Sequence, residues 1–372
     1  PTRLAPIARS GLISPVGRLR MLGDYVRRPR KDEDDETLAR FMTRRLGGEV
    51  YSNLIEPLMA GIYAGDGSVL SMEAAFPQLR TAEREHGGLI RGVLAQRAKA
   101  QKANGATPKP GFVSFETGLH ELVDALGDDI RARGGEIRTG VAVSLLERSS
   151  RGFYRVTIDR DDGPETVRAD GVVVATQAWA AAPLLESVDR HATQALEQIP
   201  HVSSAIVALG FDDPSVAPLL NGYGYVVPRT ERRPVMAMTW ISSKWPNRAP
   251  EGKALIRAFV GRAGQEEVLE CPDDRLVEIV RDELREVLGI TAAPELVQVI
   301  RWDGGMPQYT MGHLERVATL ETVTGEHSGM ALAGNMFRGV GLPDCIASGE
   351  RAADKVAADL AARGASDIAA KV

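Results

Sequence analysis

The residues best suited to chemistry lie near the end of the chain, in the stretch LAGNMFRGVGLPDCIASGERAA at 332–353. An apolar run at 330–333 predicts a strand that ends at Gly334, and a loop with two further glycines follows it. Pro343 and Asp344 then open a predicted helix. A strand, a flexible loop and a helix N-terminus present free backbone N–H groups to an anion, and glycines let the backbone approach closely. This element predicts a cofactor site.

The common catalytic and nucleotide-binding motifs are absent from the sequence. It contains no G-x-G-x-x-G turn, no P-loop, no H-E-x-x-H and no G-x-S-x-G, so no nucleophile for hydrolase chemistry is visible. The six histidines are scattered, and no cysteine pair has the spacing of metal ligands. The remaining candidates are strand-to-loop elements at 136–143 and 171–179, an aromatic loop at 302–313, and the C-terminal loop and helix.

Composition indicates a large globular protein and argues against several classes of partner. With 372 residues, of which 44% are hydrophobic, the chain is long enough for two or more domains. The net charge of −5 gives no general case for nucleic acid, and two cysteines make no disulfide framework. No apolar run reaches the ~18 residues of a membrane span. Residues 1–31 carry eight basic residues and one acidic residue, Asp24, which indicates either a solvated surface or a basic face for an acidic ligand or a membrane.

Hydrophobic periodicity predicts the elements that position these residues. Apolar residues spaced three and four apart over 14–105 predict helices. The later segments are shorter and are bounded by Pro and Gly. They predict a βαβ-like unit at 112–148, strands at 151–158 and 165–176, and a helix at 179–187. Residues 201–310 predict mixed β structure, within which lie a helix at 273–289, a last strand at 296–302 and then a loop.

Four motifs occur in an order that carries more information than any one of them. They are LMAGIYAGDGSVLSMEAAFPQL (58–79), GFVSFETGLHELVDAL (111–126), RWDGGMPQYTMGH (301–313) and GVGLPDCIASG (339–349). In this order they resemble the protoporphyrinogen/coproporphyrinogen oxidase family of flavoproteins, within the wider amine-oxidase-like FAD superfamily. The resemblance covers essentially the whole chain. It departs at Thr117-Gly118, where the family usually has two glycines, and at Gln177, where it often has Pro. The family's opening glycine turn is absent, so we expect an N-terminally truncated chain.

The resemblance implies an α/β fold with α+β features. We expect a Rossmann-like FAD-binding domain, incomplete at its N-terminus, with a mixed-β substrate domain and an inserted helical domain. The expected segments are 1–105 (mainly helical, on the substrate or membrane side), 106–190 (middle part of the FAD-binding domain), 191–305 (mixed-sheet substrate-binding domain) and 306–372 (C-terminal part of the FAD-binding domain).

The resemblance also implies an activity: FAD-dependent, O2-using oxidation of coproporphyrinogen III to coproporphyrin III, or of protoporphyrinogen IX to protoporphyrin IX, in haem biosynthesis. The soluble-looking composition favours coproporphyrinogen III. Two alternatives remain open. One is another flavin oxidoreductase, such as an amine oxidase or a carotenoid desaturase, against which the Pro307-Gln308-Tyr309 loop argues. The other is a non-catalytic porphyrin-binding remnant.

The resemblance also implies a set of site residues, whose expected role is to bind and orient the cofactor and the substrate. No side chain is expected to do acid–base chemistry and no metal is expected. The expected cofactor-binding residues are Val143 at the adenine, Trp302 and Met306 near the isoalloxazine, Gly334 and Asn335 near the ribityl–pyrophosphate portion, and Val340, Gly341 and Leu342 with their N–H groups toward the flavin. The expected substrate-binding residues are Gly61, Gly65, Tyr225, Val226, Trp240 and Ile241.

Partners and location are expected on the same grounds. The partners are the porphyrinogen and O2, without nucleic acid, and both a homodimer and peripheral contact with a membrane stay open. The basic residues Arg18 and Arg20 are candidates for long-range steering of the acidic substrate. The expected location is the cytoplasm, and peripheral attachment to the inner face of the membrane stays open as an alternative.

Overall fold

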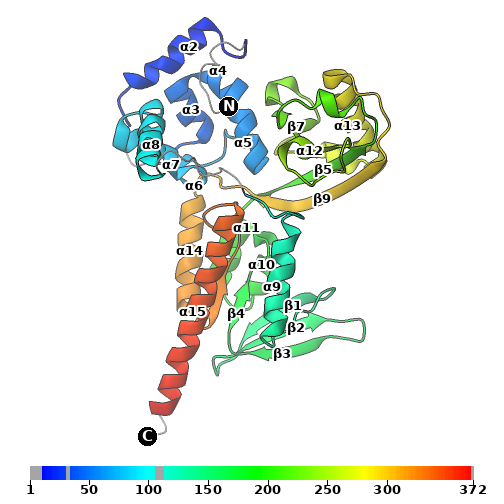
Figure 1. The fold of residues 1–372 in the computed structure, drawn as a ribbon. Coiled ribbons are helices and arrows are strands. Elements are labelled where there is room, and N and C mark those ends of the chain that lie inside the picture. The colour runs from blue at the N-terminus through cyan, green and yellow to red at the C-terminus, as the bar shows by residue number, and fades with distance from the viewer. Residues whose placement is uncertain (1–10, 31–33, 105–112, 370–372) are drawn as a thin grey trace. The chain divides into compact units, whose positions relative to one another are not determined.

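The computed structural model describes residues 11–30, 34–104 and 113–369, which form two compact units (Figure 1). One unit comprises residues 1–136 and 202–303, and the other comprises 137–201 and 304–372. Two parts of the sequence features above lie outside the described residues: Arg3, Arg9 and Lys31 among the eight basic residues of 1–31, and the first two residues of the 111–126 motif.

The first unit begins with helices, as the periodicity predicts. They are α2 (Pro15–Leu22), α3 (Leu38–Leu46), α4 (Gly48–Val50), α5 (Glu56–Tyr63), α6 (Met72–Ala75), α7 (Pro77–His86), α8 (Leu89–Asn104) and α9 (His120–Ala132), with short 3-10 and π turns at η1 (Gly23–Tyr25) and η2 (Tyr51–Ile55). Thr37 and Ser71 accept hydrogen bonds from the first turns of α3 and α6, which stops each helix from extending backward.

Buried ion pairs hold these helices together. Arg45 and Asp24 are both fully buried, and the Arg45 Nε lies 2.6 Å from the Asp24 Oδ1. Arg44 donates to Glu36 and to Glu83, which links α3 to α7. Because an unpaired buried charge is costly, these pairs fix one packing of the helices.

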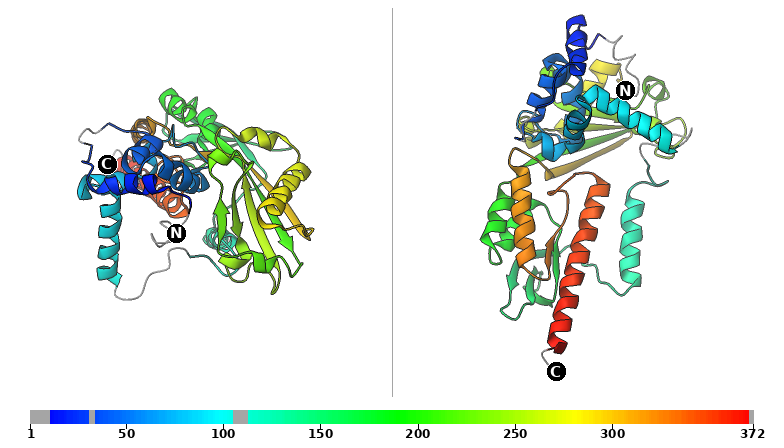
Figure 2. Two further views of the ribbon diagram at one scale, coloured as in Figure 1. Left: turned by 90° about the horizontal axis from the view of Figure 1, so that it is seen from above. Right: turned by 90° about the vertical axis from the view of Figure 1, so that its left-hand side faces the viewer.

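The same unit contains a five-stranded sheet with strand order β6-β7-β8-β5-β9. Its strands are β5 (His201–Phe211), β6 (Gly224–Val226), β7 (Val235–Trp240), β8 (Ala254–Val260) and β9 (Leu296–Pro307). Helix α13 (Asp273–Leu288) lies against one face of this sheet (Figures 1 and 2). Its buried residues Leu276, Val280 and Leu284 belong to the core on that face. Connecting elements are η3 (Ala217–Leu219), η4 (Arg229–Glu231), α12 (Ile241–Lys244) and η5 (Glu266–Glu270).

The second unit combines two small sheets with helices. Strands β1 (Ala142–Arg148), β2 (Tyr154–Asp159) and β3 (Glu165–Ala169) form an antiparallel sheet, whereas β4 (Val172–Val174) and β10 (Met330–Leu332) pair in parallel. The helices are α10 (Ala178–Leu185), α11 (Arg190–Glu197), α14 (His313–Glu326) and α15 (Leu342–Ala369). The buried residues of α10, α11 and α14 share one core with Tyr154, Leu332 and Phe337, whereas Ala352 of α15 packs with Ala331 and Ala333.

Most predicted elements are confirmed, including the helices over 14–104, α13 and the final strand and helix. The predicted strand at 112–115 is wrong for its described residues 113–115, which form neither helix nor strand. The predicted strand at 165–176 is two strands in different sheets, because the chain leaves β3 at Asp170-Gly171 and pairs with β10 only from Val172. Strand β9 continues to Pro307, through part of the expected loop.

Sequence analysis missed two helices of the second unit, α11 and α14, and α14 is the longer of them. It contains Thr and Val at five of its fourteen positions, and these β-branched residues have weak helix propensity. The helix forms because Val317, Leu320 and Val323 lie on one face and are buried in the core of the second unit. Tertiary packing overrides local preference here.

Candidate functional site

The C-terminal loop, defined as residues 333–341, connects β10 to α15. The N–H of Ala333 donates to the carbonyl of Val174 and so extends the parallel pairing by one residue. The chain then leaves the sheet at Gly334, whose φ of 121° is accessible to glycine and not to other residues. The N–H of Gly334 donates to the buried Ser348 Oγ at 3.1 Å, which ties the loop to the second turn of α15.

Two buried aromatic side chains support this loop: Tyr309, four residues before α14, and His313, the first residue of α14. The Tyr309 hydroxyl donates to the carbonyl of Asn335 and accepts from the N–H of Gly339 at 2.9 Å. The ring of His313 stacks on Tyr309, with centroids 4.1 Å apart and planes 16° apart, and its Nε2 lies 2.8 Å from the Phe337 carbonyl. The loop is therefore held at alternate residues: 335, 337 and 339.

Burial controls the charge of His313. Desolvation lowers the pKa of His313 to about 4, so the ring is neutral near pH 7. A neutral ring has one N–H, and the acceptor at Phe337 assigns it to Nε2. The buried Nδ1 has no hydrogen-bond partner among the described residues.

The end of the loop is a close glycine turn at the start of α15. A Cβ added to Gly339 would lie 2.4 Å from the Asp344 Cγ, and one added to Gly341 would lie 2.9 Å from the Asp344 Oδ2. The N–H groups in the first turn of a helix have no partner within that helix, so this turn directs donors outward. These donors and the positive end of the helix dipole fit the anionic part of a flavin.

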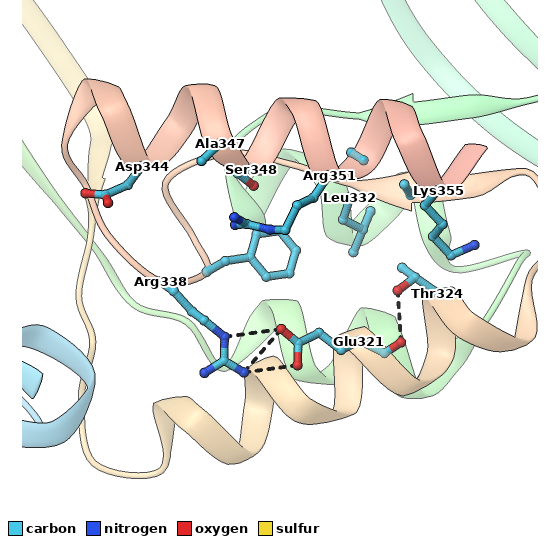
Figure 3. Close-up of a pocket in the computed structure, with 12 residues that line it drawn as sticks. Glu321, Thr324, Leu332, Arg338, Asp344, Ala347, Ser348, Arg351 and Lys355 are labelled. Carbon is cyan, nitrogen blue, oxygen red and sulfur yellow. Dashed lines mark hydrogen bonds and ion pairs between the residues drawn. The ribbon is translucent and has the colours of Figure 1, made fainter. Parts of the chain in front are cut away.

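A pocket of about 540 Å³ lies beside the loop, between α14 and α15 (Figure 3). Leu332 and Phe337 form apolar parts of its lining, and Ser348 and Arg351 reach it from α15. Arg338 lies at its edge and is paired with Glu321 of α14 at 3.0 Å. The pocket is therefore lined by residues of the C-terminal loop and of the elements that hold this loop in place.

Other expected cofactor residues lie on different elements. Val143 is exposed on β1. Trp302 and Met306 both lie on β9, but Trp302 belongs to the first unit and Met306 to the second. The structure therefore brings Gly334, Asn335 and 340–342 together on one loop. The flavin-binding roles of these residues stay predictions.

Gln177 has a structural role that sequence analysis did not find. Its Nε2 donates to the Gly305 carbonyl at 3.2 Å, and the neighbouring Trp179 Nε1 donates to the Gly304 carbonyl at 3.1 Å. These bonds anchor the end of β9 next to Met306. The Gln177 Oε1 is buried and has no hydrogen-bond partner within the described part of the chain.

Part of the expected substrate site comes together in the first unit. A Cβ on Gly61 would lie 4.0 Å from the Val226 Cγ1, so α5 and β6 are in contact there. Helix α5 ends at Ala64 in the left-handed conformation (φ 49°), which turns the chain into Gly65. The Gly65 carbonyl already accepts from the Arg229 Nη2 at 3.1 Å.

Arg229 and Glu56 fix this turn, and sequence reasoning missed both. Arg229 donates to the Gly65 and Ala263 carbonyls, and its Nε lies 3.3 Å from the Oε1 of the buried Glu56. The residues are more than 160 positions apart, so no local pattern signals the contact.

The other expected substrate residues occupy a different face of the sheet. Tyr225 donates to Glu283 of α13 and packs edge-on against Trp240, with centroids 5.7 Å apart. Trp240 is buried in the core beneath α13. These positions favour a packing role for both rings, and their contact with substrate stays a prediction, as does that of the half-buried Ile241.

Two further searches bear on the class of site. Within residues 11–30, 34–104 and 113–369, no group of three or more His, Cys, Asp or Glu side chains is arranged to hold a metal ion. No helix in the described ranges combines the length and apolar character needed to cross a membrane.

Comparison with known proteins places these features in a family context. A family model described as "Flavin containing amine oxidoreductase" matches residues 16–357. The chain is 37% identical to a protein from Bacillus subtilis named "Coproporphyrinogen III oxidase", over 95% of this chain and 74% of that protein. It is 31% identical to "Protoporphyrinogen oxidase, chloroplastic" of Nicotiana tabacum, over 96% of this chain and 68% of that protein.

A solved structure agrees with these matches. The chain resembles a putative protoporphyrinogen oxidase from Exiguobacterium sp. 255-15, with a TM-score of 0.78 and 32% identity over 94% of this chain and 73% of that one. The expected α/β flavoprotein fold is thereby confirmed.

Proposed function

Because this chain belongs to the flavin-containing amine oxidoreductase family, we propose that it binds FAD and oxidises a porphyrinogen to the corresponding porphyrin in haem biosynthesis. The observation that carries this conclusion is the 37% identity, over 95% of the chain, to a relative named coproporphyrinogen III oxidase. The C-terminal loop supports it, because its glycine turns and helix N-terminus suit an anionic planar cofactor.

The chemistry required of the chain is mainly orientation. Converting a porphyrinogen to a porphyrin removes six electrons and six protons, which reduces three O2 to three H2O2. Bound FAD would supply the acceptor for hydride equivalents and their transfer to O2. The residues of this chain then hold the macrocycle at a fixed distance and angle and exclude water, and such positioning accounts for much of an enzyme's rate.

Each candidate residue takes a role within this proposal. The backbone N–H groups of Val340, Gly341 and Leu342 would bind the flavin, with Gly334 and Asn335 at its ribityl–pyrophosphate portion. Met306, Trp302 and Val143 would complete the cofactor contacts. We assign 1–105 and 191–305 to the substrate side and 106–190 and 306–372 to the cofactor side.

For the substrate we propose coproporphyrinogen III. The three relatives with 33–37% identity carry that name, whereas the named protoporphyrinogen oxidases are 28–31% identical. Substrate contacts would come from Gly61, Gly65 and Val226 at the contact of α5 with the sheet, and from Tyr225, Trp240 and Ile241.

The test follows porphyrin fluorescence from each porphyrinogen under air, with the full chain and saturating FAD. We expect porphyrin and peroxide to accumulate together, faster with coproporphyrinogen III, and neither to form without FAD. Absence of porphyrin from both substrates contradicts the proposed function. Peroxide formation from an amine, without any porphyrin, identifies another oxidoreductase of the same family.

A second proposal concerns assembly and location. We propose a cytoplasmic enzyme that associates peripherally with the inner face of the membrane through the exposed residues Arg20 of α2 and Arg40 of α3, and that forms a homodimer. Co-sedimentation with anionic liposomes that is lost in high salt tests the first part. Light scattering of the eluted protein tests the second.

A further inference from the structure

Strand β8 presents two different faces because its side chains alternate. Ala254, Ile256, Ala258 and Val260 are buried, and all four lie in the core that α13 covers. Leu255, Arg257 and Phe259 therefore point to the opposite face. On that face Phe259 packs against a buried cluster formed by Ala60, Ala64, Val202 and Met236.

Arg257 is the charged residue on this open face, and it has an unusual environment. Its guanidinium carbon lies 4.9 Å from the centroid of the Phe259 ring, so the two planar groups interact. Its Nε is buried and has no hydrogen-bond partner, and no ion pair of Arg257 is found among the described residues. Burial lowers the pKa of Arg257, although a guanidinium remains charged at neutral pH.

The strand register leaves room in front of this pair. Across the sheet, Arg257 lies between Thr239 on β7 and Ala208 on β5. Phe259 lies between Ala237 on β7 and Ile206 on β5. Three of these four neighbours are small and three are apolar, so Arg257 is the one cation in a mainly apolar group of side chains.

The same surface adjoins the expected substrate residues. Ala237 on β7 pairs with Phe259 on one side and with Val226 of β6 on the other. Phe259, Ala237 and Val226 therefore form one row across the three strands. The row ends where Val226 approaches Gly61 of α5. The apolar row, the turn at Gly65 and the cation of Arg257 therefore share one face of the first unit.

We propose that Arg257 binds a carboxylate of the substrate and that this contact favours coproporphyrinogen III over protoporphyrinogen IX. The proposal rests on the proposed function and names the residue that selects its substrate. A carboxylate accepts two parallel bonds from a guanidinium, which would satisfy the buried Nε. Phe259 would lie against the macrocycle while Arg257 holds a propionate at its edge. A tetracarboxylate has more carboxylates to offer this cation than a dicarboxylate.

Binding of the product porphyrins to the full chain with FAD bound is the first test. We expect Arg257→Gln to weaken binding of coproporphyrin III about tenfold, the size of one lost charge-assisted hydrogen bond. Protoporphyrin IX should lose less, and coproporphyrin tetramethyl ester, which has no free carboxylate, should bind both proteins equally. Arg285→Gln makes the same chemical change at an exposed pair on α13 and is the matched control.

Steady-state oxidation is the second test. We expect Arg257→Gln to raise KM for coproporphyrinogen III about tenfold with kcat nearly unchanged, and Arg257→Lys to recover part of the loss. Equal losses with both porphyrinogens and with the ester, or no loss at all, overturn the assignment of Arg257. A wild-type protein that retains FAD but oxidises neither porphyrinogen instead overturns the proposed function. If Arg257→Gln does not fold, the Lys variant and the ester decide between the two roles.

Discussion

The C-terminal loop and the open face of the five-stranded sheet differ in how they are built. The loop is formed by backbone: glycines at 334, 339 and 341 bring N–H groups to a helix start, and buried side chains only support them. The sheet face is formed by side chains, with Phe259, Arg257 and Val226 on a rigid frame. Backbone donors suit a cofactor whose chemistry does not vary, whereas side chains on a sheet change without disturbing the fold. The comparison indicates that cofactor binding and substrate choice are separable in this protein.

The largest expected effect comes from closing the glycine turn of the loop. In Gly339→Ala the new Cβ would lie 2.4 Å from the Asp344 Cγ, at a φ of 132° that L side chains rarely adopt. Strain and overpacking together cost about 3–5 kcal/mol locally, so the purified protein should lose most of its flavin absorbance. Gly349→Ala is the matched control, since its Cβ meets no atom within 4 Å and should leave flavin bound. Full flavin content in Gly339→Ala would show that the loop does not bind the cofactor.

On the sheet side, Arg229→Gln should remove the clamp on the Gly65 turn without affecting flavin. The change leaves the buried Glu56 with Arg262 as its nearest cation, at 4.0 Å, and destabilises the first unit by about 3 kcal/mol. We expect a higher KM for the porphyrinogen and a lower thermal midpoint, but unchanged flavin content. Loss of flavin would contradict the separation of the two regions. Arg232→Gln serves as the control, because Arg232 lies three residues after Arg229 and is exposed.

The sequence predicted one region better than the other for a physical reason. Glycine, proline and helix signals are local, so the loop and α15 could be located from residues 330–353 alone. Arg229 acts through contacts with distant segments, and the surroundings of Arg257 depend on the pairing of β8 with β5 and β7, neither of which a single sequence encodes locally. The strand pattern at 254–260 predicts two faces, but only the packing of α13 decides which face is open. Helix α14 was missed because its Thr and Val residues depend on the core for their conformation.

Tyr309→Phe tests whether the loop depends on its supports. The variant keeps the stacked ring but leaves the Asn335 carbonyl and the Gly339 N–H without the hydroxyl, at a cost of about 2–3 kcal/mol. We expect weaker FAD binding by fluorescence titration and faster amide exchange at Gly339, with KM for substrate unchanged in the flavin-saturated protein. Unchanged exchange at Gly339 would mean that the glycines alone hold the loop.

The smallest expected effect is a pH dependence that belongs to the loop region and not to the sheet. His313 is neutral in the folded protein because burial lowers its pKa to about 4, while the ordinary value is 6.5. Between these values the unfolded chain binds more protons than the folded one, so His313 makes stability fall as the pH decreases through this window. From pH 7 to pH 5 the contribution amounts to about 2 kcal/mol. Arg316, Arg338 and Glu315 also act on this ring, and they keep their charges in a variant at 313.

His313→Asn isolates this contribution, because the amide retains a donor for the Phe337 carbonyl but does not titrate. Urea unfolding at pH 7 and pH 5 should show a smaller loss of stability in the variant than in the wild type, and flavin release on acidification should shift to lower pH. The control His120→Asn changes an exposed histidine on α9 and should leave the pH dependence as it is. If His313→Asn and the wild type lose equal stability between the two pH values, then protonation of His313 does not destabilise the folded protein, and the loop is not held by a neutral imidazole.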